Sequence, residues 1–292
     1  MKNIYNIIGK KILIQSDFQY EHDRNFDDFE EKSKSYDIKV KFIEKEIPYK
    51  FNYPILYDKN YIRIYQGDKG LIREFTGLTR NRCYGCLFEL SDSNSYYEYH
   101  YYTHAKQSLK NTYNIFERIA FEHILYKANT FILHSSYIKY KDKGILFSAP
   151  SGVGKSTQAS LWEQYEKAEI INGDRTAINK NNGTWCAYGL PFAGSSRIYK
   201  NVTTPLEAIV ILKQSKENSI KKLSTLEGFK YIYSETTINS WNRDFINTII
   251  NLIMDMLDSV DVYMLSCRPD RDAVDLLKNK LGDINKNERW NS

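Results

Sequence analysis

The fold is decided by residues 144–157, which read Gly-Ile-Leu-Phe-Ser-Ala-Pro-Ser-Gly-Val-Gly-Lys-Ser-Thr. An apolar run, a glycine-rich turn, and then a lysine with two hydroxyl residues are the pattern of a phosphate-binding loop between a strand and a helix. The turn and the start of the helix direct backbone N–H groups at the ligand, and the helix dipole adds positive potential. The pattern therefore predicts that the chain binds a nucleoside triphosphate with magnesium.

Individual positions of this loop have expected roles. Lys155 is expected to reach the outer phosphates, and the Ser156 hydroxyl is expected to bind magnesium. Ala149 departs from the full pattern, which has a glycine at that position. A glycine turn capped by serine and threonine at a helix start is the simpler alternative. The expected nucleotide-binding residues are Ser151, Gly152, Val153, Gly154, Lys155, Ser156 and Thr157.

The composition is that of a soluble globular protein. Of the 292 residues, 42% are hydrophobic and 26% are charged, which is ordinary for a folded domain. No run approaches the roughly eighteen apolar residues of a membrane-spanning helix, and the first residues do not resemble a secretion signal. The net charge of +5 is small and is not gathered into a stripe, so nucleic acid is not an expected partner. Four cysteines fit a reducing compartment, and the expected location is the cytoplasm, with no membrane partner.

Two regions are expected along the chain. Residues 1–108 are rich in β-forming residues and predict an antiparallel accessory layer, whereas residues 109–292 hold the candidate nucleotide site. Apolar residues at helical spacing over 113–127 predict a helix between the two regions. The fold class is therefore α/β with a mixed sheet and a strand-rich N-terminal region. The strands expected in the first region include 12–15, 38–43 and 61–65.

A hairpin is expected to lead into the glycine-rich loop. Residues 131–140 alternate like a strand, residues 141–144 form a turn, and residues 145–148 form a second strand. If Tyr140 pairs with Ile145, antiparallel register places His134 opposite Ser151, beside the phosphates. Most phosphate-binding loops follow a parallel strand, so a hairpin indicates a rarer architecture.

The elements after the loop place a carboxylate near it. A helix over 156–166 and a strand over 169–172 are expected, with that strand beside the one that leads into the loop. Asp174 follows this strand, 19 residues after Lys155. The further elements expected are strands at 184–188, 208–212 and 262–265 and helices at 225–234 and 241–258.

Three further residues and one cysteine pair are candidates for chemistry. Asp174 can bind magnesium or accept a proton from an attacking hydroxyl, although Gly-Asp is also a common turn pair. His134 is either a catalytic histidine or a satisfied strand residue, and Arg197 is either a phosphate or substrate clamp or an exposed loop residue. Cys83 and Cys86 form a C-x-x-C pair, but Cys186 and Cys267 lack the spacing of a second zinc-binding pair, so structural thiols are the default.

Six stretches resemble the HPr serine kinase/phosphorylase-like proteins, whose fold is related to phosphoenolpyruvate carboxykinase. The resemblance extends over about residues 113–280, and the order of its motifs is specific. The resemblance is closest to the short homologues linked to ribosomally made peptides, including those that phosphorylate lasso-peptide precursors. The stretches are 133–136, 145–162, 171–175, 188–196, 205–210 and 267–270.

This resemblance implies transfer of phosphate from ATP, with magnesium, to a serine-like hydroxyl of a peptide or small protein. It implies that residues 151–157 hold the phosphates, that Asp174 is the base or a metal ligand, and that His134 contacts the transferring phosphate. The larger enzymes of the family have two adjacent aspartates, and here the first is Gly173. Phosphorylase activity is therefore not expected.

The leading hypothesis is an ATP- and magnesium-dependent kinase in which Asp174, His134 and Lys155 are catalytic and Ser156 and Asp174 bind the metal. A kinase for a small metabolite and a catalytically silent nucleotide-binding regulatory protein are the alternatives. The strand-rich N-terminal region is the expected site of substrate capture in a peptide kinase. The identity of the acceptor, the choice between ATP and GTP, and a homo-oligomeric state remain open at this stage.

Overall fold

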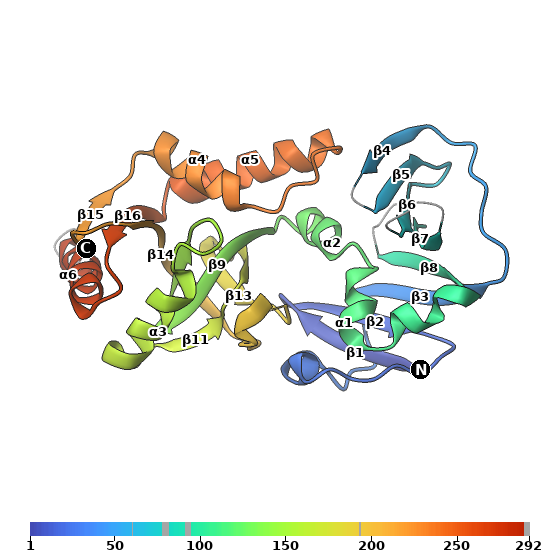
Figure 1. Cartoon of the computed structure of the whole chain (residues 1–292), viewed down its shortest axis with the longest axis horizontal. Helices are drawn as coiled ribbons and strands as arrows, with labels where there is room; N and C mark the ends of the chain where they lie inside the picture. Colours follow the sequence, from blue (N-terminus) through green and yellow to red (C-terminus); the bar gives the residue numbers. More distant parts are fainter. Residues whose placement is uncertain (60, 78–81, 91–94, 193, 289–292) are drawn as a thin grey trace. The chain divides into compact units, whose positions relative to one another are not determined.

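The computed structural model describes residues 1–59, 61–77, 82–90, 95–192 and 194–288 (Figure 1). Contacts between residues divide the chain into two compact units. The first unit comprises residues 1–128 with 240–243, and the second comprises residues 129–239 with 244–292. Each unit contains a sheet of both parallel and antiparallel strands with helices, so the fold class is mixed α/β.

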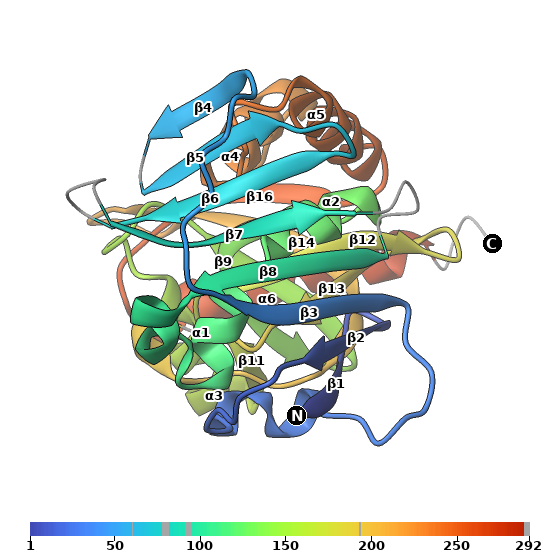
Figure 2. The same cartoon turned by 90° about the vertical axis from the view of Figure 1, so that its right-hand side faces the viewer.

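The sheet of the first unit has the strand order β1-β2-β3-β8-β7-β6-β5-β4 (Figure 2). Most neighbours are antiparallel, as the sequence predicts, but β2 pairs with β3 and β3 pairs with β8 in parallel. The expectation of a wholly antiparallel layer is therefore wrong, because long connections return the chain in the same direction. The strands are β1 (Lys2–Ile7), β2 (Lys10–Gln15), β3 (Ile38–Lys45), β4 (Ile55–Lys59), β5 (Ile62–Gln66), β6 (Leu71–Thr76), β7 (Cys83–Glu89) and β8 (Tyr96–Tyr102).

The helix expected over 113–127 is two short helices, α1 (Thr112–Glu117) and α2 (Phe121–Lys127). Ala120 interrupts them with a left-handed φ of 52°. Phe116 packs edge-on against Tyr5 of β1, with ring centroids 5.2 Å apart. This packing places α1 with the first sheet, and the first compact unit includes both short helices, up to residue 128. Two 3-10 turns, η1 (Arg24–Phe29) and η2 (Thr103–Leu109), complete the unit.

The strands of the second unit form a closed circuit of pairings. β10 pairs with β9 and β14, β9 pairs with β12, and β13 joins β12 to β14. The parallel partner of β14 on its other side is β16, and β15 pairs with β16. The strands expected from the sequence are all present. Two more strands, β12 and β15, were not predicted. The strands of this unit are β9 (Phe131–Tyr140), β10 (Lys143–Ser148), β11 (Glu169–Asn172), β12 (Arg175–Asn181), β13 (Thr184–Gly189), β14 (Thr203–Gln214), β15 (Ser219–Lys222) and β16 (Asp261–Cys267).

The β9–β10 hairpin is confirmed, but its register differs by two residues from the expected one. Tyr140 pairs with Lys143, and Ser135 pairs with Ser148 at the end of the ladder. The turn consists of Lys141 and Asp142, both with positive φ (48° and 63°), which is the geometry of a two-residue hairpin turn. His134 therefore does not lie opposite Ser151. A shift of two residues keeps each side chain on its expected face of the sheet.

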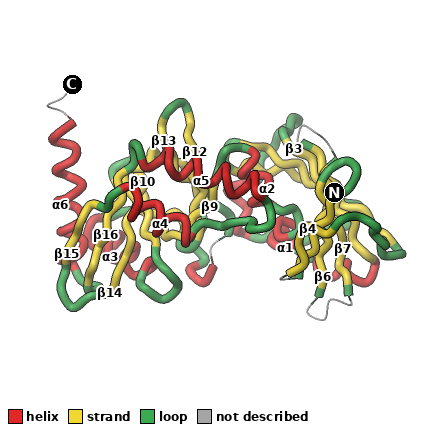
Figure 3. Tube along the Cα trace, turned by 90° about the horizontal axis from the view of Figure 1, so that it is seen from above, coloured by secondary structure: helices red, strands yellow, loops and turns green. Residues whose placement is uncertain are grey.

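Helices α3 (Lys155–Glu166) and α6 (Arg271–Glu288) pack against each other and against strands of the second unit. α6 lies beside β15 and β16 (Figure 3). The core beneath them gathers buried residues of β10, β14 and β16, with Trp162 of α3 fully buried at its centre. The other helices are α4 (Thr225–Glu235), α5 (Arg243–Leu257) and the short η3 (Gly194–Ser196).

Among the residues that the structure describes, none of the helices combines the length and the apolar character needed to cross a lipid bilayer.

Candidate functional site

The loop of residues 149–154, called the glycine loop below, connects β10 to α3. The expected strand, turn and helix are all present, with the strand ending at Ser148 and the helix beginning at Lys155. Gly152 and Gly154 have φ values of 81° and 124°, a conformation that side chains with a Cβ atom rarely adopt. An added Cβ atom at either glycine would meet nothing within 4 Å, so backbone conformation and not crowding requires glycine there.

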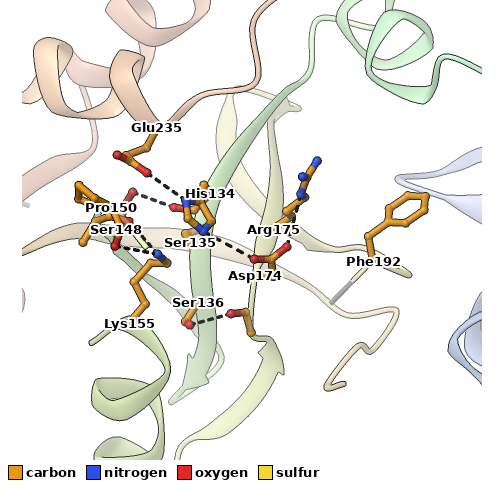
Figure 4. Close-up of polar contacts among 12 residues, drawn as sticks. His134, Ser135, Ser136, Ser148, Pro150, Lys155, Asp174, Arg175, Phe192 and Glu235 are labelled. Carbon is orange, nitrogen blue, oxygen red and sulfur yellow. Dashed lines mark hydrogen bonds and ion pairs between the residues drawn. The ribbon is translucent and has the colours of Figure 1, made fainter. Parts of the chain in front are cut away.

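Lys155 folds back over the glycine loop. Its Nζ atom donates to the carbonyl oxygens of Ala149 (2.7 Å) and Pro150 (3.4 Å), and the residue is largely buried (Figure 4). Burial lowers the pKa of Lys155, and the negative charges of Glu235 and Asp174 oppose that shift. The lysine thus lies within electrostatic reach of two carboxylates that are distant in sequence.

A pocket of about 370 Å³ lies against the glycine loop. Its walls are Gly152–Gly154, Gln158 of α3, and residues at the carboxyl ends of β14 and β16, which run parallel to β10. Gln214 reaches from β14 to the loop, where its Nε2 donates to the Val153 carbonyl at 3.3 Å. Ligands of α/β proteins commonly bind outside the carboxyl ends of parallel strands, and the volume suits a small ligand.

His134 lies between two carboxylates (Figure 4). Its Nδ1 hydrogen-bonds Glu235 Oε2 at 3.0 Å, and its Nε2 lies 3.6 Å from Asp174 Oδ1. The three side chains come from β9, from the last residue of α4 and from the turn before β12. A carboxylate on Nδ1 fixes the orientation of an imidazole ring, so Nε2 is directed at Asp174.

Asp174 is positioned by Asn172, the last residue of β11. The Asn172 Oδ1 accepts the backbone N–H groups of Asp174 (2.9 Å) and Arg175 (3.0 Å), and its Nδ2 donates to the carbonyls of Leu190 and Phe192. Asn172 is fully buried, so these four hydrogen bonds satisfy its amide. This turn holds the Asp174 backbone where β9 and β12 begin to pair.

The expected neighbour of β11 is wrong. β11 pairs with β9, and β9 separates it from β10, the strand that leads into the glycine loop. Asp174 nevertheless reaches the site because Arg175 pairs with His134 at the start of β12, and the Ser135 N–H donates to the Asp174 carbonyl at 3.0 Å. The start of β12, which pairs with β9 at His134, therefore brings the Asp174 carboxylate to the histidine.

Gly173 lies in a place that has no room for a side chain. A Cβ atom added at this position would be 2.2 Å from Ser196 Oγ and 2.4 Å from Ser196 Cβ. Similarly, a Cβ atom at Gly194 would be 2.9 Å from the carboxyl carbon of Asp174. The turn formed by η3 therefore packs directly against the segment 173–174. Ser196 fills the space that a second carboxylate at 173 would need.

The remaining polar residues expected at the site are exposed. Ser151, Ser156 and Thr157 are exposed around the glycine loop, where a ligand can reach them. Arg197 is exposed beyond η3, with a left-handed φ of 52°. The structure thus brings Lys155, His134 and Asp174 into one neighbourhood, and the role of Arg197 as a clamp stays a prediction.

Two residues of the site were missed by the sequence reasoning. Glu235 is 101 positions from His134, and the end of a helix carries no signal of what it faces. Asn172 precedes a Gly-Asp pair and could have been predicted, since Asn side chains commonly accept backbone N–H groups two residues ahead.

No family model matches the chain, and no curated protein matches it. A solved structure of the Hpr(Ser) kinase/phosphatase from Coxiella burnetii is similar over 55% of this chain and 96% of that chain, with 9% sequence identity and a TM-score of 0.35.

Proposed function

We propose that the second unit is a kinase of the HPr-kinase-like class that binds a nucleoside triphosphate at the glycine loop and transfers its γ-phosphoryl group to a hydroxyl. The observation that carries this proposal is the proximity of Lys155, the first residue of α3 after the glycine loop, to the row Glu235–His134–Asp174 (Figure 4). A lysine that reaches phosphates and a carboxylate that accepts a proton are two of the groups that enzymes use for this transfer.

Magnesium suits the side chains present. Hydroxyl and carboxylate oxygens are the donors that magnesium prefers, and Ser156 and Asp174 supply one of each. The Ser156 side chain is exposed and that of Asp174 is 29% exposed, so both are accessible. When bound, magnesium would neutralise part of the negative charge of the phosphates.

The protein groups would act in a single displacement. The acceptor oxygen forms a bond to the γ-phosphorus while the bond to the bridging oxygen breaks and the nucleoside diphosphate leaves. The Asp174 carboxylate takes the hydroxyl proton, and the Lys155 ammonium stabilises the charge that develops on the phosphoryl oxygens. To reach the phosphates, Lys155 exchanges its hydrogen bonds with the Ala149 and Pro150 carbonyls for bonds to the ligand.

The acceptor in this proposal is a serine-like hydroxyl on a peptide or small protein, as in ribosomally made precursor peptides. The support for this is the resemblance of residues 133–136, 145–162 and 171–175 to the short kinase homologues of peptide clusters. The first unit would capture the peptide, and the second would supply the chemistry. A small metabolite as acceptor is the competing possibility, and transfer assays with both classes separate them.

The decisive experiment compares wild type with Lys155→Met. We expect the wild type to transfer label from γ-labelled ATP to a serine-containing peptide. In the variant we expect the rate of transfer to be about 10²- to 10³-fold lower, since a preorganised group that stabilises the developing charge contributes at this scale. Calorimetry with a non-hydrolysable ATP analogue and magnesium should also show weaker binding.

Lys230→Met is the matched control, because Lys230 is exposed on α4. It removes the same charge and should leave the rate and the affinity unchanged. Tight nucleotide binding without transfer to peptides or small hydroxyl compounds would favour a silent regulatory protein over the proposed kinase. Equal activity of Lys155→Met and wild type would contradict the assignment of the loop itself.

Glu235→Gln tests the positioning of His134. A glutamine keeps an oxygen near Nδ1 but removes the charge that holds the ring, so we expect kcat to fall about 10- to 100-fold. The KM for ATP should change by less than about twofold, because Glu235 would act through the histidine and not on the nucleotide. Steady-state kinetics with a saturating acceptor measure both values.

Glu163→Gln, at an exposed position of α3, is the control for this change. In a His134→Gln background, Glu235→Gln should have little further effect, since the two residues would act as a unit. Additive losses in kcat would show that Glu235 acts independently of the histidine.

A further inference from the structure

The first unit contains a second cluster of reactive side chains, Glu74, Cys83 and Cys86. One carboxylate oxygen of Glu74 and the two Sγ atoms all lie within 4.8 Å of one another. Glu74 and Cys86 are buried, and Cys83 is half-buried. All three are on the paired strands β6 and β7, so the sheet itself holds the cluster together.

A β-bulge creates this cluster. Residues three apart on a regular strand point to opposite faces of a sheet, which would separate Cys83 from Cys86. Here Phe75 pairs with Gly85 and Thr76 pairs with Cys83, so one residue of β7 is extra. The bulge returns Cys83 to the face of Cys86, whose direct partner across the strands is Glu74.

Polar groups of neighbouring residues contact the cluster. Arg63 Nη1 (3.2 Å) and the Tyr65 hydroxyl (3.1 Å) both donate to Glu74 Oε2, and a carboxylate has a second oxygen for another partner. The hydroxyl of the buried Tyr102 lies 3.5 Å from Cys86 Sγ. His104 Nε2 donates to the Cys83 carbonyl at 2.9 Å, which fixes the backbone beside the sulfur.

We infer that Glu74, Cys83 and Cys86 form a binding site for zinc. Two thiolates and a carboxylate are zinc ligands, and with three protein ligands the fourth tetrahedral position is left to water or a neighbouring hydroxyl. Each thiol gives its proton to solvent as its sulfur binds the metal, with no change of oxidation state.

The charges of such a site oppose one another. Two thiolates and one carboxylate carry three negative charges and zinc carries two positive ones, and the guanidinium of Arg63 adds a positive charge that it shares between Glu74 (3.2 Å) and Asp58 (3.1 Å). A buried group of charges is tolerated when its members compensate one another.

The test measures metal binding by the full chain under reducing conditions. After removal of metals, titration with zinc should show one equivalent bound, and titration with Co²⁺ should give a thiolate-to-metal charge-transfer band in the near ultraviolet. We expect Cys83→Ser and Glu74→Gln to lose about 100-fold or more in zinc affinity, since loss of even an outer-shell partner costs 10- to 100-fold. Circular dichroism confirms that each variant is folded.

Cys186→Ser is the matched control, because Cys186 is a buried thiol of β13 in the second unit. It should keep the zinc equivalent and the cobalt band. Zinc should raise the Tm of wild type and of this control but not that of Cys83→Ser. The assignment would be overturned if reduced wild-type protein bound no zinc. It would also be overturned if Cys83 and Cys86 formed a disulfide on oxidation but bound no zinc when reduced.

Discussion

Asp174→Asn should lower the rate of phosphoryl transfer by about 10³-fold, within the range found when a positioned general base is removed. Asparagine has nearly the same shape as aspartate, but its amide cannot take up the proton of the attacking hydroxyl. The hydrogen bonds from Asn172 hold the backbone of residue 174, so the turn should keep its conformation. Single-turnover transfer from labelled ATP measures the effect on the chemical step.

Asp142→Asn is the control for this substitution. Asp142 occupies the β9–β10 turn, its side chain is 91% exposed, and it forms a surface ion pair with Lys139. This change should leave transfer within about twofold of wild type, since exposed pairs of this kind contribute little. Nucleotide affinity should be nearly unchanged in Asp174→Asn when magnesium is absent. Transfer that survives in Asp174→Asn would exclude this carboxylate as the base.

Trp162→Ala should lower the free energy of unfolding by about 3–5 kcal/mol, the cost of removing a large aromatic side chain from a packed core. Trp162 is fully buried and packs edge-on against Tyr140, with ring centroids 5.1 Å apart. Because α3 begins at Lys155, loss of this contact should also weaken nucleotide binding. Urea unfolding followed by circular dichroism measures the stability.

Trp162→Phe separates packing from polarity. Among the described residues, the Trp162 indole Nε1 is one of the buried polar atoms without a hydrogen-bond partner, so phenylalanine removes no hydrogen bond. We expect this variant to lose less than about 1.5 kcal/mol, since aromatic volume is largely kept. Equal losses in the alanine and phenylalanine variants would mean that ring volume is not what stabilises this core.

Local patterns in the sequence predicted the elements around the glycine loop well. Alternation of apolar residues defined β9 to the residue, and the glycine, lysine and hydroxyl positions placed the start of α3 within one residue. The predicted hairpin register was wrong because Lys141 and Asp142 adopt positive φ and form the turn. The sequence did not suggest this, since Gly144 is the residue that would be expected to take such a conformation. Single residues in unusual backbone conformations decide such details, and Ala120 divided the expected helix for the same reason.

The composition of the candidate site was predictable only in part. Lys155 belongs to a recognisable loop motif, and Asp174 lies at a fixed spacing from it, just after a predicted strand. Both residues could therefore be predicted from the sequence. Glu235 joins His134 through the packing of α4 on β9, which depends on the whole chain path. The pairing of β11 with β9 likewise depends on the topology of the whole sheet, since the sequence of a strand does not specify the neighbour with which it pairs.

Because a Cβ atom at position 173 would lie 2.2 Å from Ser196 Oγ, a side chain fits at position 173 only after the side chain at position 196 has been lost. An aspartate that arises first at 173 forces the η3 turn away from Asp174 and damages the existing site. A glycine that arises first at 196 removes the obstructing side chain and leaves Asp174 in place. The order of two substitutions therefore decides whether a descendant of this chain can acquire a second carboxylate.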